Sequence, residues 1–152
     1  MKKWWILFLA LTLGLMIVIF WFSSQDGEES KNISDKISTK IVTEEAAAKD
    51  GSVDWEKIAS VAVRKTAHLT LYALLGGCAV LTLRFYNIRR PWKPHAAAAL
   101  GFCLLYAVSD ELHQTFIDGR AGRVLDVLID CAGAALGIAA ALYLITKTVQ
   151  KA

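Results

Sequence analysis

The chain has 152 residues, of which 55% are apolar and 20% are charged, and its formal net charge is +3. A soluble domain of this length carries more surface charge and shorter apolar runs, so the composition favours an integral membrane protein. The basic residues do not alternate with aromatic residues on one polar face, which argues against nucleic-acid binding. The three cysteines lie in different apolar runs without metal-ligand spacing, and we expect them to be reduced packing residues.

The first apolar run spans residues 4–22 and contains no charged residue. About 20 apolar residues are enough to cross the hydrocarbon core of a bilayer. The run is too long for a signal peptide, and FSSQDG after it offers no small-x-small cleavage site. We therefore expect an uncleaved membrane anchor, with aromatic residues at its two ends in the membrane interfaces.

A long polar segment, residues 23–65, follows the first run. Ile33, Ile37 and Ile41 recur in it at every fourth position, which predicts a helix with a narrow apolar stripe. We expect this amphipathic helix to lie on the membrane surface or against the protein's own helix bundle, and a partner-binding helix is the alternative.

Three further apolar runs, at about 66–83, 95–108 and 124–145, complete the pattern. The sequence thus predicts one all-α integral membrane domain over residues 1–152. We expect a four-helix transmembrane bundle with an extracytoplasmic amphipathic segment between the first and second helices. Gly133 and Gly137 form a GxxxG motif, which predicts close helix packing within the chain or in a homo-oligomer.

The basic residues in the short loops predict the orientation, because cytoplasmic loops carry an excess of lysine and arginine. The connection between the second and third runs and the two termini are basic and contain no acid: Arg84, Arg89, Arg90, Lys93, Lys2, Lys3, Lys147 and Lys151. We therefore expect a multi-pass protein of the cell membrane with both termini in the cytoplasm. Residues 23–65 and 109–123 then face outward.

Three stretches place polar residues at membrane depth, where charges are costly and usually functional. In the first, Arg64, His68 and Tyr72 are spaced by four, and Lys65 precedes His68 by three, so they share one helical face. The alternative is a pair of cations that reach toward the interface beside a hydrogen-bonded core histidine.

The second stretch closes the third apolar run. Asp110, His113 and Gln114 share a helical face there, and an acid at the negative end of a helix needs a compensating cation. We assign Glu111 a structural or charge-pairing role and expect it to face outward as a solvated carboxylate. A simple solvated helix end is the alternative for the whole stretch.

The third stretch opens the fourth run. Arg123, Asp126 and Asp130 lie at i, i+3 and i+7, and Asp130 is about two turns inside an apolar span. A carboxylate at that depth must pair, take up a proton or bind a cation. The alternative is an internal Arg–Asp salt bridge that locks the bundle. The glycines around Arg120 allow a tight turn or a close approach to a ligand.

The motifs occur in the order Phe22-Ser23-Ser24-Gln25, Arg64-Lys65-x-x-His68-x-x-x-Tyr72, Ser109-Asp110-Glu111-x-His113-Gln114 and Gly119-Arg120-x-x-x-x-x-Asp126-x-x-x-Asp130-x-x-Gly133. This series resembles that of the VanZ-like membrane proteins. The resemblance implies a small bacterial protein at the outer face of the cytoplasmic membrane. The founding member of that family is linked to resistance to teicoplanin, a lipid-bearing glycopeptide.

Two functions fit these residues. In the first, the outer site binds or remodels an anionic lipid or a cell-wall precursor, with Asp126 and Asp130 holding the arginines in place. The candidate ligand-binding residues are Arg64, Lys65, Arg120, Arg123, Gln114, Gln25 and Tyr72.

In the second function, a membrane-embedded hydrolase or transferase acts on a lipid-linked phosphate. His113 or His68 would be the nucleophile or the general acid and base, oriented by Asp110. A metal held by Asp110, Glu111, His113 and Asp130 is an alternative, but no compact metal-ligand spacing supports it, so we predict no metal site and leave the cofactor unassigned. A transporter is a third alternative, which the lack of an internal repeat disfavours for a monomer.

Overall fold

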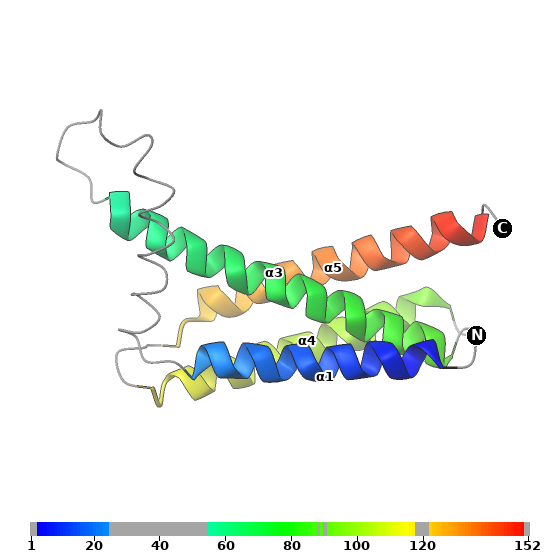
Figure 1. The fold of residues 1–152 in the computed structure, drawn as a ribbon, viewed down its shortest axis with the longest axis horizontal. Coiled ribbons are helices and arrows are strands. Elements are labelled where there is room, and N and C mark those ends of the chain that lie inside the picture. Colours follow the sequence, from blue (N-terminus) through cyan, green and yellow to red (C-terminus); the bar gives the residue numbers. More distant parts are fainter. Residues whose placement is uncertain (1–2, 25–54, 88, 90, 118–121, 151–152) are drawn as a thin grey trace.

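The computed structural model describes residues 3–24, 55–87, 89, 91–117 and 122–150. These residues form four helices and no strand: α1 (Trp4–Ser23), α3 (Trp55–Tyr86), α4 (Trp92–Gln114) and α5 (Val124–Gln150). The prediction of an all-helical membrane bundle is confirmed (Figure 1). The proposed amphipathic stripe at Ile33, Ile37 and Ile41 lies outside the described residues.

Three of these helices are long and apolar enough to cross a membrane: Trp4–Ser23, Val61–Tyr86 and Val124–Lys147. The helix α4 is not among them, although its 23 residues extend over about 34 Å at the usual rise of about 1.5 Å per residue. It starts after Pro91 and carries Pro94 in its first turn, where the missing N–H is not needed for an intrahelical bond.

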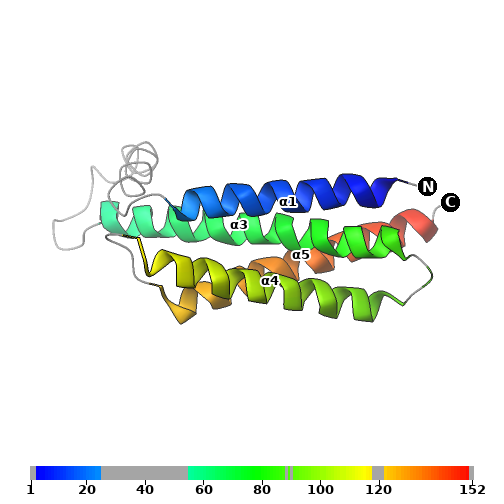
Figure 2. The ribbon, with the colours of Figure 1, turned by 90° about the horizontal axis from the view of Figure 1, so that it is seen from below.

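The chain runs back and forth along the bundle, so that its two ends differ in composition. Both described termini and the connection between α3 and α4 lie at one end (Figures 1 and 2). The end of α1, the start of α3, the end of α4 and the start of α5 lie at the opposite end. The second of these ends, called the polar end below, contains the polar stretches singled out in the sequence.

The helix α3 is central and packs against each of the other three helices. Its closest partner is α5, and small residues allow the approach. A Cβ atom on Gly133 or Gly137 would overlap the backbone of Leu69 or Ala73, respectively. A Cβ atom on Gly76 would overlap the backbone of α5 in the same way. The GxxxG motif therefore packs inside the chain, and homo-oligomerisation stays a prediction.

The remaining helices are joined by aromatic and polar contacts. The Tyr106 hydroxyl of α4 donates a hydrogen bond to the Met16 carbonyl of α1 at 2.6 Å. The hydroxyl of Thr12 returns to the carbonyl of Phe8 in its own helix, as polar groups inside a bilayer must be satisfied internally. Farther from the polar end, Phe8 also stacks on Phe85 of α3. These contacts fix α1 and α4 against each other and against α3.

Candidate functional site at the polar end of the bundle

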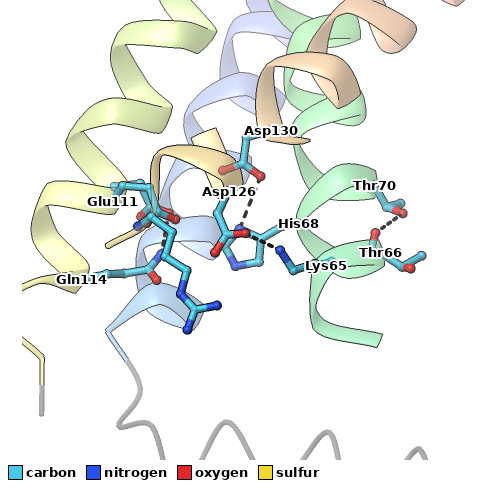
Figure 3. A network of polar contacts seen from close by, with 10 residues as sticks. Lys65, Thr66, His68, Thr70, Glu111, Gln114, Asp126 and Asp130 are labelled. Carbon is cyan, nitrogen blue, oxygen red and sulfur yellow. Dashed lines mark hydrogen bonds and ion pairs between the residues drawn. The ribbon is translucent and has the colours of Figure 1, made fainter. Parts of the chain in front are cut away.

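All four helices contribute polar side chains to one buried cluster, which we call the polar core. It consists of Ser23 from α1, His68 and Tyr72 from α3, Asp110 and Gln114 from α4, and Asp130 from α5. The Nδ1 atom of His68 lies 3.5 Å from a carboxylate oxygen of Asp130 (Figure 3). Asp110 interacts electrostatically with His68 and Asp130, the Ser23 hydroxyl lies near it without full hydrogen-bond geometry, and Gln114 Nε2 donates to it at 3.3 Å.

The polar core is shielded from solvent. Ser23, Tyr72 and Asp130 have no exposed surface, and Asp110 is only 3% exposed. Among the described residues, no hydrogen-bond partner exists for Ser23 Oγ, Tyr72 OH, Asp110 Oδ1 or either carboxylate oxygen of Asp130. The 3.5 Å contact to His68 is within ion-pair distance but lacks hydrogen-bond geometry. Buried polar groups are normally satisfied, so this unused capacity makes the polar core the candidate site.

A second group, the rim, lies at the same end beside the polar core and consists of Arg64, Lys65, Arg123 and Asp126. Lys65 Nζ binds a carboxylate oxygen of Asp126 at 2.6 Å, and both side chains are about one-third exposed (Figure 3). The expected pairing of Asp126 and Asp130 with arginines stays a prediction, because Arg120 lies outside the described residues. Among the described residues, Asp126 binds Lys65, because α3 packs directly along α5, and Asp130 faces His68 for the same reason.

Glu111 is also placed differently from the expectation. It is only 6% exposed, and its carboxylate accepts a hydrogen bond from the backbone N–H of Arg123 at 2.8 Å. Arg123 directly precedes α5, and its carbonyl accepts the first hydrogen bond of that helix, from Asp126 N at 2.9 Å. Glu111 thus caps the start of α5 from another helix, as the glutamate of a capping box does within one helix. The outward-facing position was wrong.

His113 does not join the polar core. Its ring stacks on Phe20 of α1 with centroids 4.6 Å apart, and its Nε2 atom lies 3.2 Å from Ser24 Oγ. With the Ser24 hydroxyl donating to the Phe20 carbonyl at 2.7 Å, the imidazole in its Nε2–H tautomer donates to the serine. A serine that gives its proton to a carbonyl is not activated as a nucleophile by this histidine. His113 therefore fastens α4 to α1, and the shared face with Asp110 does not bring them into one site.

A family model described as VanZ/LLP1 matches residues 8–146. The chain belongs to the VanZ/LLP1 family. Neither a curated protein nor a solved structure matches it. The matched region includes every residue of the polar core and the rim, so the site lies inside the part of the chain that defines this VanZ/LLP1 protein.

The structure brings together most of the residues that the sequence singled out. His68, Tyr72, Asp110 and Gln114 meet in the polar core of the VanZ/LLP1 bundle, as their spacing suggested. Gln25 and Arg120 lie outside the described residues. Among the described residues, no three His, Cys, Asp or Glu side chains are placed to hold a metal ion.

One residue of the polar core, Ser23, was missed. It ends α1 and has no exposed surface, but it stands at the boundary of an apolar run where a loop residue is the usual expectation. The signal available in the sequence was its place in Phe22-Ser23-Ser24-Gln25, the first motif of the family series.

Proposed function

We propose that this VanZ/LLP1 protein binds the phosphate-bearing head group of an anionic lipid or lipid-linked envelope precursor at one membrane surface. The observation that carries the proposal is the joint position of a cationic rim and a buried, incompletely satisfied polar core at one end of a membrane bundle. Lipid head groups lie at the ends of membrane helices, where such a site can reach them.

The rim offers the groups that recognise phosphate. Arg123 is exposed and Arg64 is half-buried, and neither forms an ion pair with any described residue. A guanidinium offers forked hydrogen bonds that match phosphate oxygens. Lys65 is held by Asp126, which lies in the turn after Arg123, so the ammonium stays near the start of α5. A phosphate that competes with Asp126 for Lys65 would remodel this pair.

A lipid-composition experiment tests the proposal. The purified protein is placed in nanodiscs of phosphatidylcholine with a minor share of phosphatidylglycerol, and retained lipids are counted by native mass spectrometry. We expect enrichment of phosphatidylglycerol, reduced about tenfold by Arg123→Gln through loss of a charged hydrogen-bonding group. Arg89→Gln, which removes an exposed arginine at the opposite end, is the matched control. Retention of the two lipids by the wild-type protein in proportion to their shares in the nanodisc would contradict the proposal.

We also propose that the polar end faces outward from the cell membrane and that both termini are cytoplasmic. The support is that the described termini share one end of the bundle with the basic connection that contains Arg89. Cytoplasmic loops are enriched in such residues. Alkaline phosphatase fused after Ala152 should be inactive and a fluorescent protein at the same position bright. The reverse result would invert the orientation.

The resemblance to a family linked to teicoplanin adds a cellular proposal. If the rim acts on envelope lipids, expression in a susceptible host should lower susceptibility to this lipid-bearing glycopeptide more than to a glycopeptide without an acyl chain. Arg123→Gln should abolish the difference, and Arg89→Gln should preserve it. An equal effect on both antibiotics would contradict a role that depends on the lipid.

A second candidate is a hydrolase or transferase acting on a lipid-linked phosphate, and one observation favours it. Asp130 lies beside Nδ1 of His68, where a carboxylate can orient an imidazole for proton transfer. Turnover of lipids labelled in the head group tests this function. Product formation that is lost in folded His68→Ala and retained in His113→Ala would support the enzyme, and wild-type binding without any product would support the binder.

A further inference from the structure

The polar core and the rim differ in chemistry, although they belong to one end of the bundle. The rim contains three cations and one carboxylate. The polar core contains two carboxylates, and its unpartnered atoms are all oxygens that can accept hydrogen bonds: Ser23 Oγ, Tyr72 OH, Asp110 Oδ1, Asp130 Oδ1 and Asp130 Oδ2. A single phosphate cannot satisfy both groups, because carboxylates repel it.

Exposure decreases from the rim to the polar core. The side chain of Lys65 is 34% exposed and that of His68 is 21% exposed, whereas Asp130 is fully buried. His68 therefore connects the surface pair Lys65–Asp126 with the buried carboxylate. A head group that approaches the rim would meet cations first and acceptors second.

The polar core holds two carboxyl groups and one imidazole. When Asp110 and Asp130 are both ionised, they leave one negative charge even beside a protonated His68, and both are almost fully buried. A buried charge without a partner is strongly unfavourable. A cation with several N–H donors would supply both the missing charge and the missing hydrogen bonds.

We propose that the head group carries a primary ammonium beside its phosphate, with the phosphate on the rim and the ammonium in the polar core. This inference rests on the proposed function for its phosphate contacts and extends the lipid class to head groups that also carry an ammonium, zwitterionic ones included. The ammonium donates to Asp130, Asp110 and the Tyr72 hydroxyl, and the phosphate binds Arg123 and Arg64. The flexible side chain of Lys65 moves from Asp126 to the phosphate and opens the path past His68.

Other head groups match the polar core less well. A polyol donates hydrogen bonds but leaves the negative charge in place. A quaternary ammonium has the charge but no N–H donor, and it is bulkier than a primary ammonium. The comparison of phosphatidylethanolamine with phosphatidylcholine isolates this difference, because both are zwitterionic and carry the same phosphodiester.

The test measures this pair of lipids, with identical acyl chains, by native mass spectrometry of the full-length protein. We expect the wild-type protein to prefer phosphatidylethanolamine about tenfold, the worth of a hydrogen bond to a charged group. Asp130→Asn should bring the ratio close to one. Tyr72→Phe should reduce it by about threefold or more, because one hydrogen bond from the charged ammonium is lost, and Tyr143→Phe, which removes an exposed hydroxyl elsewhere, should leave it unchanged.

The phosphatidylglycerol measurement separates this inference from the proposed function. Retained enrichment of phosphatidylglycerol without any preference for phosphatidylethanolamine would overturn the ammonium inference alone. A folded Asp130→Asn variant that keeps the preference would also overturn it. If Asp130→Asn does not accumulate, Tyr72→Phe decides, and an unchanged ratio in that variant overturns the inference.

A soluble phosphate ester separates a lipid from a free ligand. O-phosphoethanolamine carries the same phosphate and ammonium without acyl chains. We expect it not to displace phosphatidylethanolamine at equal concentration, because it lacks the membrane anchor. Displacement at equal concentration would overturn the assignment to a lipid.

Discussion

The helices α3 and α5 meet in two different ways along their length. Toward the middle of the bundle, Gly133 and Gly137 bring α5 against the backbone of α3. One turn before Gly133, Asp130 faces His68, and Asp126 binds Lys65. Gly133 and Gly137 leave no room for a Cβ atom against α3. The Asp130 carboxylate, in contrast, has no hydrogen-bond partner among the described residues. The comparison teaches that close packing fixes the first half, whereas the second half keeps unused hydrogen-bonding capacity, on which the proposed ligand site rests.

Gly137→Ala gives the largest expected effect. The added Cβ would overlap the backbone of Ala73, so the helices must separate, and we expect a loss of about 3 kcal/mol of unfolding free energy. Unfolding in detergent micelles measures it. Gly101→Ala is the control, because its Cβ meets no atom within 4 Å, and the protein should gain up to about 1 kcal/mol. Equal stability of the two variants would break the comparison.

Glu111→Ala is expected to have the next largest effect, because Glu111 caps the start of α5 and so has a structural role at the polar end. The backbone N–H of Arg123 would lose its acceptor, at a cost of about 1–2 kcal/mol. Hydrogen exchange at the Arg123 amide should accelerate in parallel. Glu111→Gln keeps an acceptor oxygen and should lose clearly less. Similar losses in both variants would show that the carboxylate acts by its charge and not as a cap.

Asp130→Asn should act in the opposite direction. Because both carboxylate oxygens are buried and lack hydrogen-bond partners among the described residues, removal of the charge should raise the unfolding free energy by about 1 kcal/mol. The same unfolding assay measures the gain, and lipid binding should weaken. A variant that fails to accumulate would instead make the polar core a structural lock.

The pair Lys65–Asp126 should give the smallest effect. Both side chains are about one-third exposed, and such pairs are worth about 0.5 kcal/mol. A double-mutant cycle with Lys65→Gln and Asp126→Asn measures the coupling, which should decrease at high ionic strength. A coupling energy that does not decrease with salt would show that the pair stabilises the fold as the glycine contacts do.

The sequence predicted the helices well because the apolar runs are long. It placed the third run at 95–108, whereas α4 extends from Trp92 to Gln114. The difference arises at the polar end, where Asp110, Glu111 and Gln114 continue the helix while buried in the bundle. Hydropathy treats such residues as a loop, since it does not record which neighbours surround them.

The site was predicted in its members more than in its pairings. Helical spacing correctly grouped His68 with Tyr72, because both lie on one face of one helix. It could not show that His113 turns toward α1 while Asp110 turns toward the polar core, since this depends on how α4 is rotated against its neighbours. The partner of Glu111 is the backbone N–H of Arg123, and every residue except proline has such a group, so the sequence could not reveal this bond.

That bond has a consequence for the order in which the protein assembles. The first turn of α5 receives its cap from α4, so an isolated α5 segment would enter the bilayer with Arg123 N–H open to the interface. Membrane helices commonly insert first and associate afterward. The start of α5 should then become ordered only when α4 docks, and the polar end would be the last part of the bundle to close.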